Sequence, residues 1–368
     1  SLKKARLHRK VATTIFFESN GGQAKEGEAT VPEIRLAVGE PDLDLGNIET
    51  ALEALSETCY YLRVERNRYR FGLSPNLNKM LADRQATITE ERIEECVRAE
   101  IIKTFRKETG VEVIHFAEQS SQVPDRPVLT LVVLPPQYSK GEKGTMTFLE
   151  TMIREYGRSG RTFKSALLFA IPETLTPLRE DARKLLAWQE IKDEEGDRLD
   201  DSQRTQLTEN LRKAQRDLGE AVWRVYRNIA LLGKDNQVRL VDLGLVHSSQ
   251  SSSLVKVIVE RLRQDGDIEA GISPNFLIRN WPPAISEWST KAVRDAFFAC
   301  PQFPRLLQGD TVIKETIARG VVEGLLAYVS KSDNGYKQFF FEQSIQPAEI
   351  EISEDMFIIT AEEAKKHK

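Results

Sequence analysis

Cysteine and histidine are scarce in this sequence, and their positions exclude the common metal sites. The three cysteines are Cys59, Cys96 and Cys300. They lie far apart and are odd in number, so neither a disulfide framework nor a zinc knuckle is expected, and a reducing cytoplasm fits best. No histidine lies four residues from another or at ligand spacing from a cysteine. We therefore expect no metal in this chain and no other cofactor.

Long apolar runs and an excess of one charge are absent as well. No apolar run approaches the ~18 residues that a membrane helix needs, and no apolar signal-peptide segment follows the basic residues near the start. We expect no association with a membrane. The 52 Lys and Arg residues are balanced by 56 Asp and Glu residues, which excludes a globally basic coat for nucleic acid. Any contact with DNA must therefore be local.

A phosphate-binding loop is also missing. Such a loop needs glycines followed by Lys and Ser or Thr, placed after a strand and opening a helix, so that backbone N–H groups meet the phosphates. The nearest match, residues 157–162 (GRSGRT), precedes its predicted strand and lacks the lysine, and we interpret it as a flexible basic loop. Without a phosphate loop, the acids that follow two apolar strands, Glu173 and Asp242, do not indicate ATP hydrolysis.

Nucleophilic and acid–base sites show no clear pattern either. His247 lies beside Ser248 and Ser249, but a polar linker explains this stretch more simply than a Ser/His pair. No pair of carboxylates stands out as general acid and base, so the chain is predicted not to be an enzyme. The alternative is an active site assembled from residues distant in the sequence, which a deep pocket lined by charged groups with strongly shifted pKa values would indicate.

The first part of the chain has the element order of a winged helix. Apolar spacing predicts helices at residues 7–17, 31–38 and 48–59, the first stopped by residues 19–22 (SNGG). Residues 60–64 and 68–71 alternate around Glu65-Arg66-Asn67, which predicts a β-hairpin. Three helices followed by a hairpin predict a winged-helix-like module.

The same order returns at the other end of the chain. Helices are predicted at residues 290–298 and 311–319, and strands at residues 325–329 and 336–341. The strands flank residues 332–335 (SDNG), and Asn-Gly accepts the positive φ values that a tight hairpin needs. A second winged-helix-like module with a C-terminal tail is therefore expected.

Mixed α/β sequence lies between these modules. Strands are predicted at residues 111–116, 128–134, 165–171 and 238–243, of which the middle two are nearly continuous apolar runs suited to a sheet covered on both faces. Helices are predicted at residues 146–156 and 175–191, and a longer one carries apolar residues from Leu207 to Leu232. The two long helices form either a projecting antiparallel hairpin or a cover packed on the body.

The predicted fold is therefore a mixed α/β body with a helical hairpin at about residues 175–232, flanked by two winged-helix-like modules. A chain of 368 residues, 40% of them hydrophobic, predicts two or three domains, and the expected boundaries are 1–88, 89–285 and 286–368. The chain begins with Ser rather than Met and within a helical pattern, so we expect it to be part of a longer protein.

The predicted first hairpin is locally basic. In a winged helix the third helix usually enters the major groove and the wing touches phosphates, so the charges on these elements are diagnostic. Candidate phosphate ligands on and just after the first wing are Arg63, Arg66, Arg68, Arg70 and Lys79. Candidates in the second module, offset by nearby acids, are Lys314 and Arg319. Duplex DNA, bound without reading its sequence, is thus an expected partner.

The charges of the third helices argue against base reading. The first carries Glu49, Glu53 and Glu57, which would repel a DNA backbone, and neither has the Arg, Asn or Gln face of a base reader. Two interpretations stay open: backbone contact with DNA through the first wing, or a protein-interaction scaffold that does not bind DNA. In the second case the arginines pair with neighbouring acids, as surface arginines usually do. Whether the four wing arginines form one exposed positive face discriminates between the two.

Three sets of residues carry a family resemblance. They are residues 68–71 (RYRF) with 74–78 (SPNLN), residues 166–172 with Leu186-Ala187-Trp188, and residues 317–326 around GVVEG. They resemble the large bacterial and archaeal AAA-type ATPases grouped as domain-of-unknown-function family 499. The similarity spans nearly the whole chain, but these motifs are structural signatures rather than catalytic ones.

The resemblance implies a parent protein with its ATPase domain N-terminal to this region, similar to components of phage-defence systems that act with DNA methyltransferases and helicases. This chain would be the region after the ATPase lid, with the upstream ATPase domain and other defence-system subunits as partners. It implies an ATP-driven role on DNA for the parent and supplies no catalytic residue here. The leading hypothesis is therefore a non-catalytic, DNA-engaging assembly region of such an ATPase.

Overall fold

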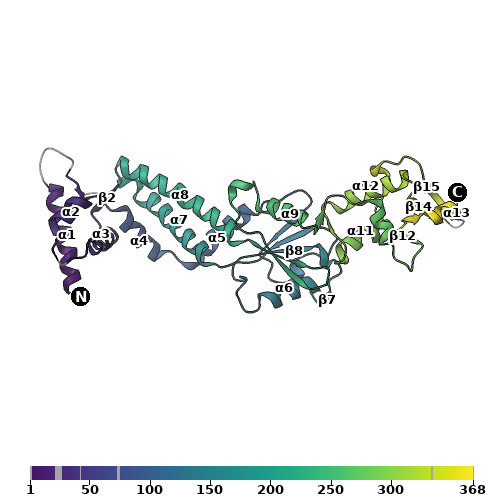
Figure 1. Ribbon diagram of the computed structural model, residues 1–368, viewed down its shortest axis with the longest axis horizontal. Helices are drawn as coiled ribbons and strands as arrows, with labels where there is room; N and C mark the ends of the chain where they lie inside the picture. Colours follow the sequence, from purple (N-terminus) through teal and green to yellow (C-terminus); the bar gives the residue numbers. More distant parts are fainter. Residues whose placement is uncertain (1, 21–26, 42, 73–74, 333–334, 368) are drawn as a thin grey trace. The chain divides into compact units, whose positions relative to one another are not determined.

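The computed structural model describes residues 2–20, 27–41, 43–72, 75–332 and 335–367 and has a mixed α/β fold with several small sheets and one long pair of helices (Figure 1). Its contacts divide the chain into two compact units, Ser1–Ala99 with Pro177–Gly219, and Glu100–Thr176 with Glu220–Lys368. The three-part division at residues 88 and 285 stays a prediction. Within the described ranges, no helix is both long and apolar enough to cross a membrane.

The first unit begins with three helices and a small sheet around one apolar core. Its elements are α1 (Leu2–Asn20), β1 (Ala29–Thr30), α2 (Val31–Val38), α3 (Gly46–Thr58), β2 (Leu62–Glu65), β3 (Arg68–Phe71) and α4 (Leu77–Thr87). The three strands are antiparallel in the order β1-β3-β2. The core takes buried side chains from all three helices and the sheet, among them Ile15, Ile34, Leu52 and Leu62. The predicted helices and hairpin are confirmed, while residues 21–22 of the predicted stop lie outside the described residues.

The beginning of α2 shows why the chain turns helical at the predicted residue. The side chain of Thr30 accepts a hydrogen bond from the backbone N–H of Glu33, and the Glu33 carboxylate accepts one from the backbone N–H of Thr30. This capping box satisfies donors that a helix start otherwise leaves unpaired. Pro32 lies in the first turn, where its missing N–H costs nothing.

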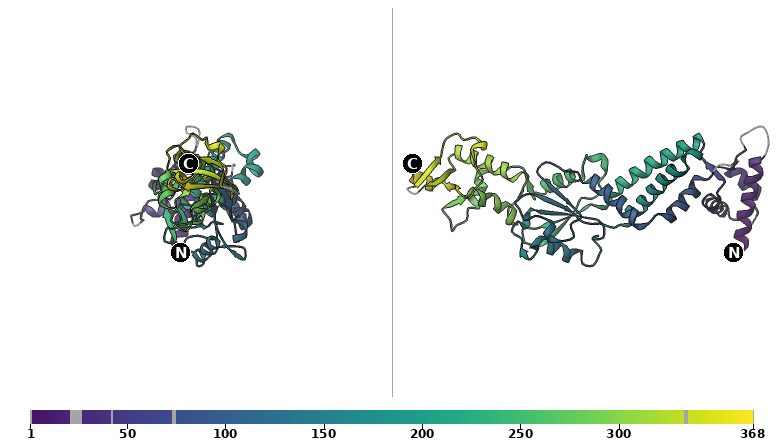
Figure 2. Two further views of the ribbon diagram at one scale, coloured as in Figure 1. Left: turned by 90° about the vertical axis from the view of Figure 1, so that its right-hand side faces the viewer. Right: turned by 180° about the vertical axis from the view of Figure 1, so that it is seen from behind.

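A long helical pair follows the predicted pattern. The helices α7 (Thr176–Glu195) and α8 (Asp201–Val225) run side by side and antiparallel, as both sides of the molecule show (Figures 1 and 2). Ion pairs tie α7 to α4 and to α5 (Glu90–Thr104); they are Arg84 with Glu194, Arg92 with Glu190, and Arg183 with Glu90. The pair is therefore packed along neighbouring helices over part of its length.

The second long helix ends earlier than its apolar pattern predicts. Residues 229–232, expected to continue the helix, lie in the strand β9 (Asn228–Leu232). Their spacing from Val222 and Val225 fits a helix, but Ile229 to Leu232 are four consecutive apolar residues, all buried within a sheet. A short continuous apolar run does not distinguish strand from helix by periodicity alone, and here burial on both faces favours the strand.

A five-stranded sheet forms the centre of the second unit. Its strands are β4 (Glu112–His115), β5 (Thr130–Val133), β8 (Leu167–Ile171), β9 and β10 (Val238–Asp242), in the order β10-β9-β8-β5-β4. The strands β4, β5 and β8 are parallel, and β9 and β10 are antiparallel to their neighbours. Every residue of β5 and β8 is buried, which confirms the prediction that both faces are covered. The helix α6 (Thr145–Arg154) adds Leu149 and Met152 to this core.

The rest of the second unit contains a second small fold. Its elements are α9 (Leu254–Gln264), β11 (Ile268–Glu269), α10 (Pro274–Arg279), β12 (Glu287–Ser289), α11 (Thr290–Ala299), β13 (Arg305–Leu306), α12 (Gly309–Val322), β14 (Leu326–Ser332), β15 (Gly335–Phe340), β16 (Met356–Thr360) and α13 (Ala361–Lys366). The predicted helices and strands of this part are confirmed; residues 333–334 of the predicted turn lie outside the described residues. The segment expected to be a tail instead supplies β16, which lies between β12 and β14 in a four-stranded sheet.

Candidate nucleic-acid interface

The first hairpin makes its turn with two residues in the left-handed region. Glu65 pairs with Arg68, and between them Arg66 and Asn67 have φ values of 48° and 63°. Positive φ at both central residues is the arrangement that matches the twist of a two-residue hairpin. Asn adopts it readily, whereas Arg does so at a cost, so Arg66 is held at the tip against its own backbone preference.

The two faces of this hairpin differ in character. Leu62 and Tyr69 are buried in the core of the first unit, and Val64 and Phe71 pack against it. Side chains alternate along a strand, so the opposite face carries the residues between them. These are Arg63, Glu65, Arg68 and Arg70. Arg63 lies directly opposite Arg70 on the neighbouring strand.

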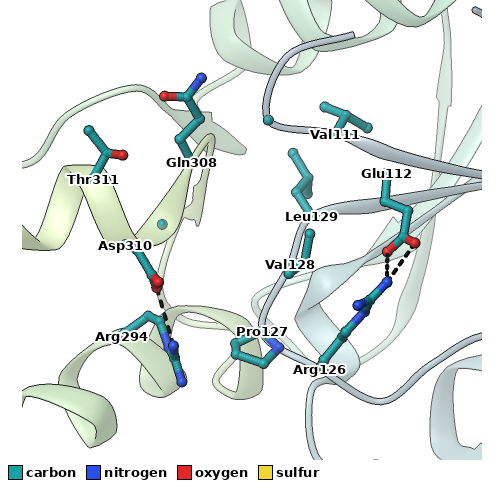
Figure 3. Close-up of a pocket in the computed structure, with 12 residues that line it drawn as sticks. Val111, Glu112, Arg126, Pro127, Val128, Leu129, Arg294, Gln308, Asp310 and Thr311 are labelled. Carbon is teal, nitrogen blue, oxygen red and sulfur yellow. Dashed lines mark hydrogen bonds and ion pairs between the residues drawn. The ribbon is translucent and has the colours of Figure 1, made fainter. Parts of the chain in front are cut away.

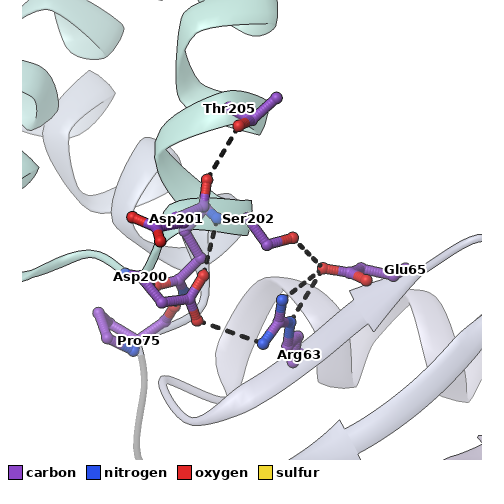
Figure 4. A network of polar contacts seen from close by, with 8 residues as sticks. Arg63, Glu65, Pro75, Asp200, Asp201, Ser202 and Thr205 are labelled. Carbon is purple, nitrogen blue, oxygen red and sulfur yellow. Dashed lines mark hydrogen bonds and ion pairs between the residues drawn. The ribbon is translucent and has the colours of Figure 1, made fainter.

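Arg63 is held by acids rather than left free. Its Nη2 lies 2.7 Å from Glu65 Oε1 and its Nη1 lies 3.3 Å from Asp200 Oδ2 (Figure 4). Ser202 Oγ also donates to Glu65 Oε1 at 3.1 Å. Hydrogen bonding from Arg63 lowers the pKa of Glu65, so the carboxylate stays charged and keeps its partner. Asp200 is 137 residues from Arg63, and nothing in the local sequence indicates this contact.

Two further candidates are also paired. Arg68 Nη1 lies 3.2 Å from Glu28 Oε2, although 60% of the Arg68 side chain remains exposed. Lys79 Nζ lies 2.5 Å from Asp83 Oδ1, one helical turn away on α4. Exposed pairs of this kind hold together weakly, but a phosphate must compete with the acid for each cation.

Arg66 and Arg70 are the remaining cations of the hairpin. Both are exposed, and neither has an ion pair among the residues that the structure describes. The four arginines of the hairpin therefore do not form one uniform positive face. Two are neutralised by acids, and two are available, Arg66 at the tip and Arg70 on the central strand β3.

The third helix presents acids next to this hairpin. Glu49, Glu53 and Glu57 are all exposed on α3, and among the described residues only Glu49 forms an ion pair, with Arg35. A groove of about 740 Å³ runs between α2, α3 and the hairpin tip, with Glu49 and Glu53 on one side and Arg66 on the other. The groove thus has mixed charge, which disfavours insertion of α3 beside phosphates.

The second-module candidates differ from each other. The Arg319 guanidinium donates to the carbonyl of Ile272, where Thr316 Oγ1 also donates at 3.3 Å. Arg319 therefore holds a neighbouring loop. Lys314 is half-buried on α12 and has no ion pair among the described residues.

A hollow of about 640 Å³ in the second unit lies between the starts of β4 and β5 and the first turn of α12 (Figure 3). Its floor is apolar, with Val111, Val128 and Leu129. Its charged side chains are paired: Arg126 Nη2 lies 2.6 Å from Glu112 Oε1, and Arg294 Nη1 lies 3.2 Å from Asp310 Oδ1. Charges that neutralise each other at the rim do not indicate an acid–base site.

The glycine-rich segment at residues 157–162 differs from its prediction. The strands β6 (Glu155–Tyr156) and β7 (Ser159–Gly160) form a tight hairpin, and Arg161 directly after it is buried. The Arg161 Nε, Nη1 and Nη2 atoms donate to the carbonyls of Met152, Pro124 and Ser120 at 3.1, 3.2 and 3.0 Å. The interpretation of this segment as a flexible basic loop is therefore wrong, because it forms a hairpin and its second arginine is buried and hydrogen-bonded to three carbonyls.

The two acids that follow apolar strands lie in one ion network. Arg227 contacts both, with Nε 3.8 Å from Glu173 Oε2 and Nη2 2.9 Å from Asp242 Oδ2. Lys140 Nζ lies 3.6 Å from Glu173, and Asn228 donates to the same carboxylate at 2.6 Å. The hydrogen bond from Asn228, together with these cations, lowers the pKa of Glu173. Two carboxylates facing two cations make a balanced network, and the described residues hold no group of three or more potential metal ligands.

The Ser/His stretch is arranged around an acid. Ser248 Oγ donates to the carboxylate of Glu220, and His247 Nδ1 lies 3.8 Å from the same group. A serine nucleophile needs the histidine between itself and the acid, so that the imidazole takes the hydroxyl proton. Here the acid lies between the two, and the arrangement supplies no activated serine.

The left-handed turn leads to a prediction on stability. Changing Arg66 to Asn is expected to raise the free energy of unfolding by about 0.5–1 kcal/mol, because Asn adopts positive φ at lower cost. Urea unfolding followed by circular dichroism measures the change. Arg70→Asn is the control, since it removes the same charge from extended backbone in β3 and should bring no gain. Equal effects of the two variants would show that backbone strain at Arg66 is negligible.

The candidate interface is thus the polar face and tip of the β2–β3 hairpin, with Arg66 and Arg70 as its free cations in the described chain. Arg63, Arg68 and Lys79 flank them in ion pairs. No protein-family model, curated protein or solved structure matches the chain.

Proposed function

We propose that this chain is the non-catalytic, DNA-engaging and assembly region of a larger AAA-type ATPase of the family-499 kind, acting in the cytoplasm in bacterial or archaeal phage defence. Its partners are then duplex DNA, bound without sequence readout, the upstream ATPase domain and other defence-system subunits. The resemblance to that family of residues 68–71 with 74–78, of residues 166–172 with 186–188, and of residues 317–326 supports this assignment.

The proposal includes two winged-helix-like modules, at residues 1–88 and 286–368, around an α/β domain. The order α1, β1, α2, α3, β2, β3 with β1 beside β3 supports the first, because a winged helix has this order of helices and strands. The order β12, α11, α12, β14, β15 supports the second, to which β16 adds an inner strand.

One observation carries the DNA role: Arg66 and Arg70 are exposed on the wing and have no ion pair among the described residues. A wing contacts the phosphate backbone, and unpaired guanidinium groups bind phosphate without first losing an acid. Arg63 and Arg68 must break an ion pair to do the same. The wing therefore binds phosphate mainly through two of its four arginines, and α3 stays out of the groove because of its glutamates.

The test compares two variants that lose equal charge. Arg66→Ser with Arg70→Ser is expected to lower the affinity for random duplex DNA at least about tenfold, whereas Arg63→Ser with Arg68→Ser lowers it far less. Fluorescence anisotropy of the full chain across a salt series measures both. Two phosphate contacts predict a slope of about −2 for log affinity against log salt, whereas four contacts predict about −4.

Equal losses in the two variants would contradict the assignment of Arg66 and Arg70. No binding at low salt would contradict DNA engagement altogether and leave the second candidate function, a protein-interaction scaffold. A specific observation favours that candidate: Glu49, Glu53 and Glu57 expose an acidic face on the helix that a DNA-reading winged helix would insert. Such a face complements a basic protein surface rather than a phosphate backbone.

A further inference from the structure

The start of α8 lies against the polar face of the β2–β3 hairpin (Figure 4). Both belong to the first unit, although 137 residues separate Arg63 from Asp200 in the sequence. Arg63 and Glu65 project from that face, on the side opposite to the buried Leu62. Three polar contacts join α8 to the hairpin and to the segment after it, and together they are called the α8 contact. They are Asp200 with Arg63 at 3.3 Å, Ser202 with Glu65 at 3.1 Å, and Gln203 with the carbonyl of Pro75 at 2.7 Å.

The α8 contact covers part of the face that the proposed function assigns to DNA. Arg70 lies directly opposite Arg63 on the neighbouring strand, so a free cation and the covered cation are neighbours on this face. The Arg63 side chain is 32% exposed, compared with 60% for Arg68 on the same hairpin. The carboxylate of Asp200 therefore lies beside the cations to which a phosphate backbone would bind.

Different acids occupy different edges of the Arg63 guanidinium. Glu65, two residues further along the same strand, accepts hydrogen bonds from Nε at 3.0 Å and from Nη2 at 2.7 Å. Asp200 accepts one from Nη1 at 3.3 Å. A guanidinium has N–H donors on more than one edge, so it can bind a carboxylate on one edge and a phosphate on another. Glu65 thus fixes the direction of Arg63, and Asp200 occupies the Nη1 edge that a phosphate would use.

The ion pair between Asp200 and Arg63 can break without unfolding α8. Asp200 also caps this helix: its Oδ1 accepts from the backbone N–H of Gln203 at 2.9 Å, and Gln203 Oε1 accepts from the backbone N–H of Asp200 at 3.2 Å. The oxygen that faces Arg63 is Oδ2, which takes no part in the cap. The Asp200 side chain is 38% exposed, and ion pairs with such access to water are weak.

We propose that Asp200 is an internal competitor for phosphate, which keeps Arg63 from DNA and so limits the affinity of the hairpin. A carboxylate and a phosphate bind the same N–H donors of a guanidinium, so one excludes the other at the Nη1 edge. Such coupling is reciprocal: DNA that takes Arg63 breaks its pair with Asp200, and any movement of α8 away from the hairpin raises the affinity for DNA. The inference rests on the proposed DNA role and names a regulation of that site by the position of α8.

The test removes the competing carboxylate and keeps a good helix cap. Asp200→Ser is expected to raise the affinity of the full chain for random duplex DNA about threefold to tenfold at low salt, because Ser caps a helix as well as Asp does but leaves Arg63 Nη1 free. With Arg63 as a third phosphate contact, the slope of log affinity against log salt should change from about −2 to about −3. Fluorescence anisotropy across a salt series measures both quantities, and circular dichroism shows whether each variant is folded.

Asp201→Ser is the matched control. It removes the same charge from the next residue, whose side chain is fully exposed and pairs with Arg204 of its own helix at 3.7 Å. Its affinity for the duplex should change by no more than about twofold, because salt screens an exposed charge that contacts no hairpin residue. Adding Arg63→Ser to Asp200→Ser should abolish the gain, because the cation that was freed is then absent.

The outcomes separate this inference from the DNA role itself. An equal gain in Asp201→Ser, or a gain that survives the loss of Arg63, would show a general effect of charge and overturn the competition. Unchanged or lower affinity in Asp200→Ser would overturn it as well, because the α8 contact would then only position the hairpin. Duplex binding by the wild type leaves the DNA role intact in each of these cases. Absence of duplex binding by the wild type and by every variant would overturn the DNA role and the inference with it.

Discussion

Changing Arg161 to Met is expected to lower the free energy of unfolding by about 3–5 kcal/mol. The Arg161 side chain is fully buried, and its guanidinium donates to three backbone carbonyls, those of Met152, Pro124 and Ser120. Met fills much of the volume but donates nothing, so three buried acceptors lose their partners, and each unsatisfied group costs about 1–3 kcal/mol. Burial lowers the pKa of Arg161, against the effect of the nearby Asp125 carboxylate, which shows that the site holds the charge at a cost.

The neighbouring Arg158 provides the control for this change. It lies in the same hairpin, is exposed, and forms no ion pair among the described residues, so Arg158→Met should alter stability by no more than about 0.5 kcal/mol. Arg161→Lys separates charge from geometry: one ammonium cannot reach three carbonyls as the planar guanidinium does, so most of the loss should remain. Urea unfolding of the full chain measures the stability of all three variants. A loss for Arg158→Met equal to that for Arg161→Met would contradict a stabilising role for the three hydrogen bonds of Arg161.

The sequence could not distinguish these two arginines. In residues 157–162 both stand between glycines and small polar residues, a composition that indicates a solvated loop. Burial of Arg161 depends on Pro124 and Ser120, which lie 37 and 41 residues away in the chain. A local pattern holds no information on such distant partners. The composition of a short segment therefore does not show which of its charged residues are exposed and which are buried.

The same limit applies to the candidate interface. Periodicity and turn chemistry predicted the hairpin, because both depend on residues within a few positions of each other. The state of its arginines was not predictable, because Arg63 is paired with Asp200 and Arg68 with Glu28.

The type of an element was predictable where its apolar pattern persists over several helical turns. The prediction failed where the pattern is short. The helices α2, α3, α7 and α12 follow their apolar spacing closely. The strand β9 was taken for helix because its apolar residues continue the helical spacing of α8, and β16 was missed because five residues near the end of a chain carry little periodicity. In both cases the pairing with a distant strand decides the structure.

Changing Phe169 to Ala is expected to lower the free energy of unfolding by about 3–5 kcal/mol. Phe169 is fully buried in β8, where it pairs with Val132 of β5 on one side and Ala230 of β9 on the other. Truncation removes apolar contacts and leaves a cavity in the middle of the sheet, which neighbours paired on both sides cannot close. Leu240→Ala is the matched control, because Leu240 is 39% exposed on the edge strand β10, and its loss should stay below about 1 kcal/mol. Thermal and urea unfolding of the two variants measures the difference, and similar losses would mean that Phe169 is not held in a close-packed core at the centre of the sheet.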